Sequence, residues 1–218
     1  MQPRPHGRTR RIRWLLAIVA VVILGAAAIA PVRHALLRGV GRMLTVSDGA
    51  DSADLLAMDA ESGAAGVLTL SDLYRAHPSA TLALLRPVST SLDAELERRG
   101  VRQPDFAFDT LRQLGVPASA IVRIAAGEGG TTESTAALAA WARANPGKRV
   151  LVVVGPSHGR RYRRALRRAW PGALPVPAVV TTRYGLFRSE DWWQSRTTLR
   201  EGLVEIEKLA LDYAAHPF

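Results

Sequence analysis

The feature that most constrains the fold is an unbroken run of β-branched and apolar residues, VLVVV, at Val150 to Val154, directly after Arg149 in the expected strand 149–154. A strand that is apolar at every position is typical of the interior of a parallel sheet, where helices cover both faces. Short apolar runs of this kind alternate along the chain with helical patterns of about 10–15 residues. This alternation predicts βαβ units and a doubly wound α/β domain with a mainly parallel sheet.

The expected elements follow from this alternation. Strands are expected at residues 54–58, 80–85, 121–125, 149–154 and 176–180. Helices are expected at residues 66–77, 106–114, 132–144, 157–170 and 190–214. Stop signals support two of the helix ends, because Gly115 and then Pro117 follow the second helix and Asn145-Pro146-Gly147 follows the third.

An uncharged apolar segment, Trp14 to Val32, precedes this domain. Its 19 residues come close to the length of about 20 that spans a bilayer core. Five arginines lie before the segment and three lie shortly after it, which favours an N-terminus inside the cytoplasm and a translocated remainder. We therefore expect a basic cytoplasmic arm at 1–13, a transmembrane anchor at 14–32, a connector at 33–53 and the α/β domain at 54–218, outside the cytoplasm.

Other interpretations of this segment stay open. Ala28-Ile29-Ala30 resembles a signal-peptide cleavage site, although Pro31 is unfavourable directly after a cut. Arg10-Arg11 is compatible with a twin-arginine export signal, and the segment is also compatible with a buried helix of a soluble protein.

Charge and composition exclude several function classes. The formal net charge is +10, but residues 1–45 hold eight arginines and no acidic side chain, so the rest of the chain is close to neutral. This distribution removes most support for nucleic-acid binding, and none is expected. The chain has no cysteine, which excludes disulfides, cysteine nucleophiles and iron–sulfur sites.

A glycine-rich loop with hydroxyl side chains lies between the third expected strand and its helix, at residues 126–135. Glycines let a ligand approach the backbone, and the free N–H groups of a helix start favour an anion. Glu133 is a candidate base or histidine-orienting carboxylate; the alternative is an acid that complements the helix dipole. The candidate ligand-binding residues of this loop are Gly130, Thr131, Thr132 and Ser134.

A second candidate segment, Gly155-Pro156-Ser157-His158-Gly159, directly follows the central strand. His158 is a candidate acid/base, and the alternative is an exposed histidine in the first helical turn. Ser157 is a candidate ligand-binding residue, and the alternative is an N-cap of the helix. Arg161 is a candidate anion clamp. This sequence also matches the G-x-S-x-G pattern of a nucleophile elbow. A hydrolase triad is nevertheless unfavoured, because a proline precedes the serine and suitable triad partners are lacking. Asp59, a further candidate ligand-binding residue, and Glu61 follow the first strand and are compatible with the same crevice.

Other features have structural interpretations. Tyr162, Ala165, Leu166, Ala169 and Trp170 form one buried helical stripe, while five arginines form a solvated face or one that attracts anionic lipid. In the last helix, a stripe at residues 199, 203, 206, 210 and 213 predicts packing on the sheet, and Trp192-Trp193 predicts core packing. No metal-binding motif occurs, so no metal site is expected, and the identity of any cofactor stays unknown.

Together these motifs resemble the YdcF/SanA/ElyC family of bacterial envelope proteins, a domain family of unknown function. The matching segments of the expected third and fourth strands and their helices are Leu114-Gly115-Val116-Pro117 with Ile121, Thr131 to Ala136, and Val150 to Val154 with Ser157-His158 and Arg161. The matching segments near the C-terminus are Asp191-Trp192-Trp193 and Glu201-Gly202-Leu203 with Glu205 to Tyr213. The resemblance implies a Rossmann-like three-layer sandwich, a crevice holding Glu133, His158 and Arg161, and an anchor in the bacterial inner membrane. It also implies a role in envelope or peptidoglycan-precursor metabolism.

One departure from the family is the turn after the first strand, which reads Asp59-Ala60-Glu61-Ser62-Gly63 where the family usually has glycines. Acidic side chains in this turn would repel a phosphate group, whereas the backbone N–H groups of a glycine-rich turn would bind one. The leading hypothesis is a membrane-tethered protein that binds an anionic, lipid-linked cell-wall precursor. The alternatives are a non-catalytic binding or regulatory module of the same fold, and a protein that binds a nucleotide or S-adenosylmethionine.

Overall fold

The structure, a computed structural model, describes residues 14, 25, 29–49, 52–87, 89–101, 104–127 and 130–217. The chain divides into two compact units, residues 1–40 and 41–218, and the second contains the sheet. The expected basic arm and most of the expected membrane segment lie outside the described residues. Within the described part of the chain, no helix combines the length and the apolar character that crossing a bilayer requires.

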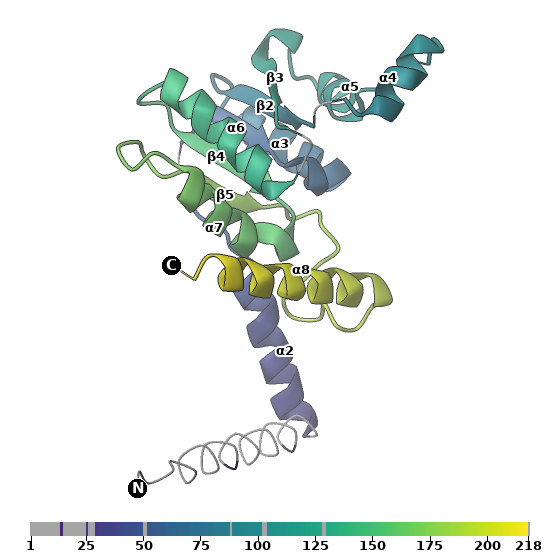
Figure 1. The fold of residues 1–218 in the computed structure, drawn as a ribbon, viewed down its shortest axis with the longest axis vertical. Coiled ribbons are helices and arrows are strands. Elements are labelled where there is room, and N and C mark those ends of the chain that lie inside the picture. The colour runs from purple at the N-terminus through teal and green to yellow at the C-terminus, as the bar shows by residue number, and fades with distance from the viewer. Residues whose placement is uncertain are drawn as a thin grey trace, which may run out of the picture. The chain divides into compact units, whose positions relative to one another are not determined.

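The second unit is built on a five-stranded sheet in which every pairing is parallel (Figure 1). The spatial order is β3-β2-β1-β4-β5, so the strand order reverses between β1 and β4. This is the arrangement of a Rossmann-like α/β fold, and it confirms the prediction of an α/β domain with a parallel sheet. The strands are β1 (Leu55–Met58), β2 (Thr81–Arg86), β3 (Ile121–Ala125), β4 (Val150–Val154) and β5 (Ala178–Thr181).

The helices connect these strands and extend beyond them. The α-helices are α2 (Ala30–Leu44), α3 (Gly63–Ala76), α4 (Ser91–Arg98), α5 (Phe106–Gln113), α6 (Thr131–Ala144), α7 (Gly159–Ala169) and α8 (Arg196–Ala215). Three short 3₁₀ turns are η1 (Ala60–Ser62), η2 (Ala118–Ala120) and η3 (Pro156–His158). Residues 33–44, expected to belong to a connector, are therefore helical.

Two apolar cores cover the two faces of the sheet. On one face α6 and α7 pack against the strands, with Leu138 and Leu166 fully buried. On the other face α3 and α5 do so, with Leu70 and Leu111 fully buried. Every residue of β4 is buried, because the strand lies inside the sheet between these two layers. Burial on both faces explains the continuous run of β-branched residues in the sequence of this strand.

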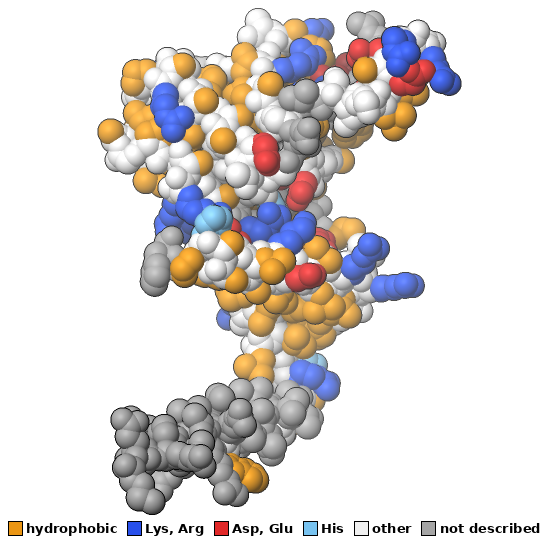
Figure 2. Space-filling model, viewed as in Figure 1, with side chains coloured by type: hydrophobic (Ala, Val, Ile, Leu, Met, Phe, Trp, Pro, Cys, Tyr) orange, Lys and Arg blue, Asp and Glu red, His pale blue; other side chains and the backbone are white. Residues whose placement is uncertain are grey.

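The amphipathic stripe predicted for the basic helix is confirmed, since Tyr162, Ala165, Leu166 and Trp170 are buried. Its arginines are not simply solvated. Arg163 pairs with Asp48, and Arg164 and Arg168 both pair with Asp212. Figure 2 shows basic side chains gathered along the boundary between α7 and α8.

The prediction that an apolar stripe packs the last helix against the sheet is wrong. Helix α8 contacts α7 and η3 rather than lying on the sheet. Its buried residues are Thr198, Gly202, Glu205 and Leu209, while Leu203 is 54% exposed. The reason is that α8 is attached through polar groups to the basic face of α7, so its apolar stripe does not decide which side faces inward.

Helix α8 also begins later than expected, at Arg196 rather than at residue 190. The side chain of Ser195 accepts a hydrogen bond from the Thr198 backbone N–H and so caps the helix. Upstream, Trp192 is buried at 2% exposure, as predicted for core packing.

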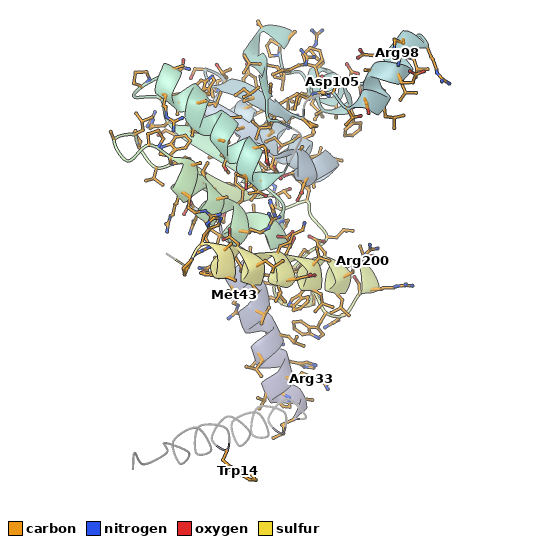
Figure 3. The ribbon with its side chains drawn as sticks, in the orientation of Figure 1. Trp14, Arg33, Met43, Arg98, Asp105 and Arg200 are labelled. Carbon is orange, nitrogen blue, oxygen red and sulfur yellow. The ribbon has the colours of Figure 1, made fainter. Side chains whose placement is uncertain are left out.

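Helix α4 was not expected, because none of its residues is buried and it therefore has no apolar stripe. A capping box between Thr90 and Asp93 defines its start. The next helix, α5, is capped by Asp105 (labelled in Figure 3), whose side chain also pairs with Arg123.

Candidate functional site

The candidate site lies where the strand order reverses, at the carboxyl ends of β1 and β4. In an open parallel sheet, the connections that leave these two strands diverge to opposite faces, and ligands bind in the crevice between them. Two short turns leave the strands here, η1 after β1 and η3 after β4. They bring together acidic and basic side chains that are almost 100 residues apart in the sequence.

The turn after β1 supplies two carboxylates. Asp59 is 3% exposed, whereas the side chain of Glu61 is 55% exposed. Burial, and to a smaller extent the charge of Glu61, raises the pKa of Asp59, although His158 opposes the rise. The Oδ2 atom of Asp59 is buried and has no hydrogen-bond partner within the described structure.

The turn after β4 supplies His158, which is 4% exposed. Its Nε2 atom lies 3.8 Å from Oδ2 of Asp59 and 3.9 Å from Oε2 of Glu61. These separations are too long for direct hydrogen bonds, and they leave space for an atom shared by the three side chains. The ring of Tyr162 packs edge-on against the imidazole, with the centroids 5.6 Å apart.

The other side of the imidazole faces Glu205 on α8. Nδ1 of His158 lies 3.1 Å from Oε2 of Glu205. Arg161 donates to Glu205 from Nε at 2.9 Å, and Lys208 donates to it from Nζ at 3.2 Å. Burial alone would raise the pKa of Glu205, but the hydrogen bonds and charges of His158 and Arg161 outweigh burial and hold that pKa far below its ordinary value.

The Nδ1 atom has a second neighbour, Nη2 of Arg161, at 2.8 Å. When Nδ1 carries a proton it donates to Glu205, and Nε2 then faces Asp59 and Glu61. When Nδ1 is unprotonated it accepts from Arg161 instead. The site can therefore hold the imidazole in either state without moving it.

Of the glycine loop residues, Thr131 reaches this cluster. Its buried Oγ1 accepts from Nη1 of Arg161 at 2.7 Å and lies 3.3 Å from Nε2 of His158. Gly130 precedes the helix with a φ of 104°, a left-handed conformation that favours glycine. Thr131 is thus the first residue of α6, close to the imidazole.

The other predicted residues of this loop do not join His158. Glu133 is exposed on the first turn of α6, and its side chain folds back toward Gly127 and Gly130. Thr132 is exposed and its carbonyl accepts from the Thr135 hydroxyl, while Ser134 is buried in α6. The carboxylate that contacts the imidazole is Glu205, and a catalytic role for Glu133 stays a prediction.

Ser157 lies in η3 and does not cap α7. Its Oγ donates to Oε1 of Glu201 on α8 at 2.5 Å. This bond ties the turn after β4 to the last helix, beside the contact between His158 and Glu205.

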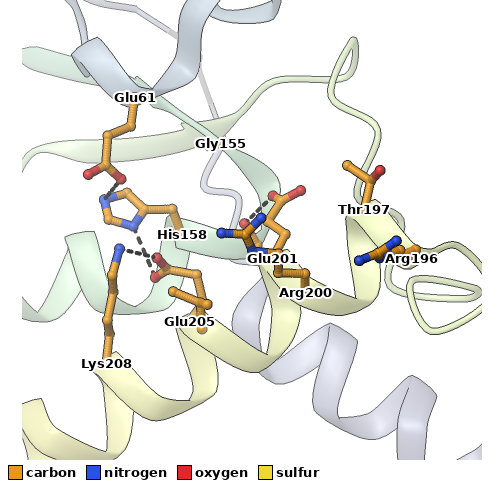
Figure 4. Close-up of a pocket in the computed structure, with 11 residues that line it drawn as sticks. Glu61, Gly155, His158, Arg196, Thr197, Arg200, Glu201, Glu205 and Lys208 are labelled. Carbon is orange, nitrogen blue, oxygen red and sulfur yellow. Dashed lines mark hydrogen bonds and ion pairs between the residues drawn. The ribbon is translucent and has the colours of Figure 1, made fainter.

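These side chains border a pocket of about 580 Å³ between η1, η3 and α8 (Figure 4). Arg196 and Arg200 are exposed at its edge, and neither pairs with a carboxylate within the described part of the chain. The lining residues are Glu61, Gly155, Ser157, His158, Arg196, Thr197, Arg200, Glu201, Val204, Glu205 and Lys208.

The α8 residues of the site were not expected from the sequence. Glu201, Glu205 and Lys208 are spaced i, i+4 and i+7, which places them on one helical face. That polar periodicity was a usable signal, but the apolar stripe on the same helix suggested the opposite orientation. The pocket therefore combines η1, η3 and a helix at the C-terminal end of the chain.

The fold and the site define a Rossmann-like α/β domain with a histidine–carboxylate cluster at its topological switch point. Comparison of the chain with protein-family models, with curated proteins and with solved structures found no match.

Proposed function

We propose that the pocket binds a small phosphorylated or otherwise anionic molecule and that His158 exchanges a proton with it. The observation that carries this proposal is the imidazole held against Glu205, at 3.1 Å, in a pocket bordered by Arg196 and Arg200, which pair with no carboxylate among the described residues. Histidine is the side chain whose charge changes nearest to neutral pH, and a carboxylate partner orients its ring.

The cations that face the ligand are Arg196 and Arg200 rather than Arg161. Arg161 already donates to Glu205 and Thr131, so its positive charge is used within the protein. Arg196 and Arg200 are exposed and line the pocket, where planar guanidinium groups suit phosphate or carboxylate oxygens. In this proposal Arg161 positions Glu205 and Thr131, and α8 binds the anion.

The proposed biological setting is the cell envelope. The uncharged segment at 14–32 and the arginines before it support a membrane anchor with the α/β domain outside the cytoplasm. An anionic precursor on a polyprenyl-phosphate carrier suits both the tether and the basic edge of the pocket. Two measurements test the anchor: resistance to alkaline extraction from membranes, and the activity of an alkaline phosphatase fused at the C-terminus, which requires export. Extraction as a soluble protein or an inactive fusion would contradict the setting.

The binding proposal is tested by thermal shift and calorimetry, with inorganic pyrophosphate and geranyl phosphate as probes. Arg196→Ala with Arg200→Ala is expected to weaken binding at least about tenfold, the effect of losing about 1.4 kcal/mol. The matched control is Arg112→Ala with Arg143→Ala, which removes the same charge from exposed positions away from the pocket. Equal affinity in the two double variants would overturn the anion-binding role.

The proton-transfer role requires a separate readout. His158→Gln keeps a polar side chain of similar size, and it is expected to abolish turnover of a bound phosphorylated substrate while the protein stays folded. Undiminished turnover by a folded variant would exclude acid/base chemistry at this residue. Binding without turnover in the unmodified protein would support the non-catalytic alternative instead.

A further inference from the structure

A second feature of the switch point is the arrangement of three potential ligand atoms around one position. Asp59, Glu61 and His158 each present one oxygen or nitrogen, and these three atoms lie within 4.8 Å of one another. Nε2 of His158 is 3.8 Å and 3.9 Å from the two carboxylate oxygens. Atoms that share one ion at about 2.1 Å lie about 3–4 Å apart, so small side-chain rotations would complete the coordination.

The state of Asp59 is the independent observation that points to a ligand here. Its side chain is 4% exposed, and Oδ2, the oxygen nearest to the imidazole, has no hydrogen-bond partner within the described structure. The Glu61 backbone N–H donates to this carboxyl group, but an oxygen atom that stays buried without a partner is unfavourable unless a cation or a donor satisfies it. An ion between Asp59 and His158 would supply what Oδ2 lacks.

The surroundings of His158 match those of a metal-binding imidazole. In metal sites, the nitrogen that does not bind the metal usually donates to a carboxylate, which fixes the ring and leaves the other nitrogen free as a ligand. Nδ1 faces Glu205 in this way, and Nε2 faces Asp59 and Glu61.

The nearby charges favour a cation at this position. The positive charge of Arg161 acts on Asp59, but Glu205 pairs with Arg161 at 2.9 Å. Lys208 also pairs with Glu205, at 3.2 Å. The carboxylates of Asp59 and Glu61 have no ion pair with a lysine or arginine within the described residues.

We propose that Asp59, Glu61 and His158 bind a divalent transition-metal ion, Zn²⁺ or Mn²⁺. The imidazole ligand disfavours Mg²⁺ and Ca²⁺, which prefer sites made only of oxygen. The exposed side of Glu61 faces the pocket, so coordination positions stay open there for water or an anionic oxygen. Such an ion would also reverse the sign of the acidic turn, which by itself repels an anion.

An ion on Nε2 of His158 takes the position of the proton that this imidazole exchanges in the metal-free protein, and metal binding is measured with the metal alone, independently of the proposed function. Full-length protein, stripped with a chelator, is titrated with ZnCl₂, MnCl₂ and MgCl₂ by calorimetry and thermal shift. We expect about one Zn²⁺ or Mn²⁺ per chain, a rise in Tm, and at least about tenfold weaker binding of Mg²⁺. Pulsed electron paramagnetic resonance of the Mn²⁺ form is expected to show a directly bound imidazole nitrogen that His158→Gln removes.

Glu61→Gln is the informative variant, because an exposed side chain can be changed without unfolding the domain. It is expected to weaken metal binding at least about tenfold, whereas the matched control Glu97→Gln on exposed α4 leaves it unchanged. Lack of stoichiometric Zn²⁺ or Mn²⁺ binding, or equal affinity in Glu61→Gln and Glu97→Gln, would overturn the assignment. If pyrophosphate binds in the presence of chelator and no metal binds, the metal site is wrong and the proposed anion binding is supported. If metal binds and no anion does, the metal site is supported and the proposed anion binding is wrong.

Discussion

Oε2 of Glu205 lies 3.1 Å from Nδ1 of His158, although the two residues are 47 positions apart in the chain. The contact joins η3, at the end of the central strand, to α8, which makes its main contacts with α7 and η3 rather than with the sheet. Arg161 completes the arrangement by donating to Glu205 and to Thr131. A single carboxylate therefore both orients the imidazole and holds the last helix against the domain.

The first prediction concerns this carboxylate. Glu205→Gln keeps the shape of the side chain but leaves Arg161 without its counter-charge, and breaking one partner of a buried ion pair costs about 3 kcal/mol or more. We expect a loss of about 3 kcal/mol in the free energy of unfolding in urea. Glu207→Gln, on the exposed side of the same helix, is the control and is expected to change stability by less than about 0.5 kcal/mol. Equal stability of the two variants would show that the Glu205 ion pair contributes nothing.

The fold was largely predictable from the sequence because its signals are local. Every expected strand is present within two residues of its predicted bounds, and the three inner strands β2, β1 and β4 are buried along nearly their whole length, which requires a continuous apolar run. The α4 helix could not be recognised, because all its side chains stay exposed or half-buried and only its cap stabilises the start. The orientation of α8 was mispredicted because its ion pairs with α7, and not the predicted apolar stripe, decide which face of the helix turns inward.

The site was predictable only in part. His158, Asp59 and Thr131 come together because strand ends meet at one edge of a parallel sheet, which the alternation of elements already implies. Glu205 reaches them because α8 packs beside η3, and the sequence around the strand ends does not predict that packing. Glu133 occupies the expected helix turn, but its side chain folds back on its own loop, and backbone position alone does not determine that direction.

The second prediction is a pH dependence of the α7–α8 attachment. Burial alone would raise the pKa of Asp212, but hydrogen bonds and charges from Arg168 and Arg164 lower it below its ordinary value of 3.8. A carboxyl group with a lowered pKa in the folded state stabilises the protein above its unfolded pKa. That stability is lost as the pH falls through the lower folded value.

Asp212→Asn should therefore destabilise the protein most at about pH 7, and the difference from the unmodified protein should shrink below about pH 4. Urea unfolding at a series of pH values measures this difference. Asp109→Asn, a change at an exposed position on α5, serves as the control and is expected to show no such convergence. A constant difference across the whole pH range would contradict the assignment to Asp212.

The third prediction concerns the hydroxyl of Tyr162, which is buried and has no hydrogen-bond partner within the described structure. Burial, together with the charge of Asp59, raises the pKa of this phenol well above its ordinary value, so it stays neutral. Tyr162→Phe removes an unsatisfied polar atom and keeps the edge-on packing against His158. We expect the free energy of unfolding to stay equal or to rise by about 0.5 kcal/mol. A loss of more than about 1 kcal/mol would mean that the hydroxyl does have a partner in solution.

The last prediction concerns the close approach of α8 to Trp192. A Cβ atom added at Gly202 would lie 2.4 Å from Cε3 of Trp192 and 3.1 Å from Cε2 of Phe187. Trp192 is buried and stacks on Phe187 with the ring centroids 5.8 Å apart, so neither ring can move aside cheaply. Alanine favours a helix over glycine by about 1 kcal/mol, but overpacking costs about 1–3 kcal/mol, so Gly202→Ala is expected to destabilise the protein by about 1–2 kcal/mol. Thermal unfolding measures the change, with Gly172→Ala as the control because that position opens onto free space. If Gly202→Ala were as stable as the control, α8 would not be packed against Trp192 as tightly as this contact requires.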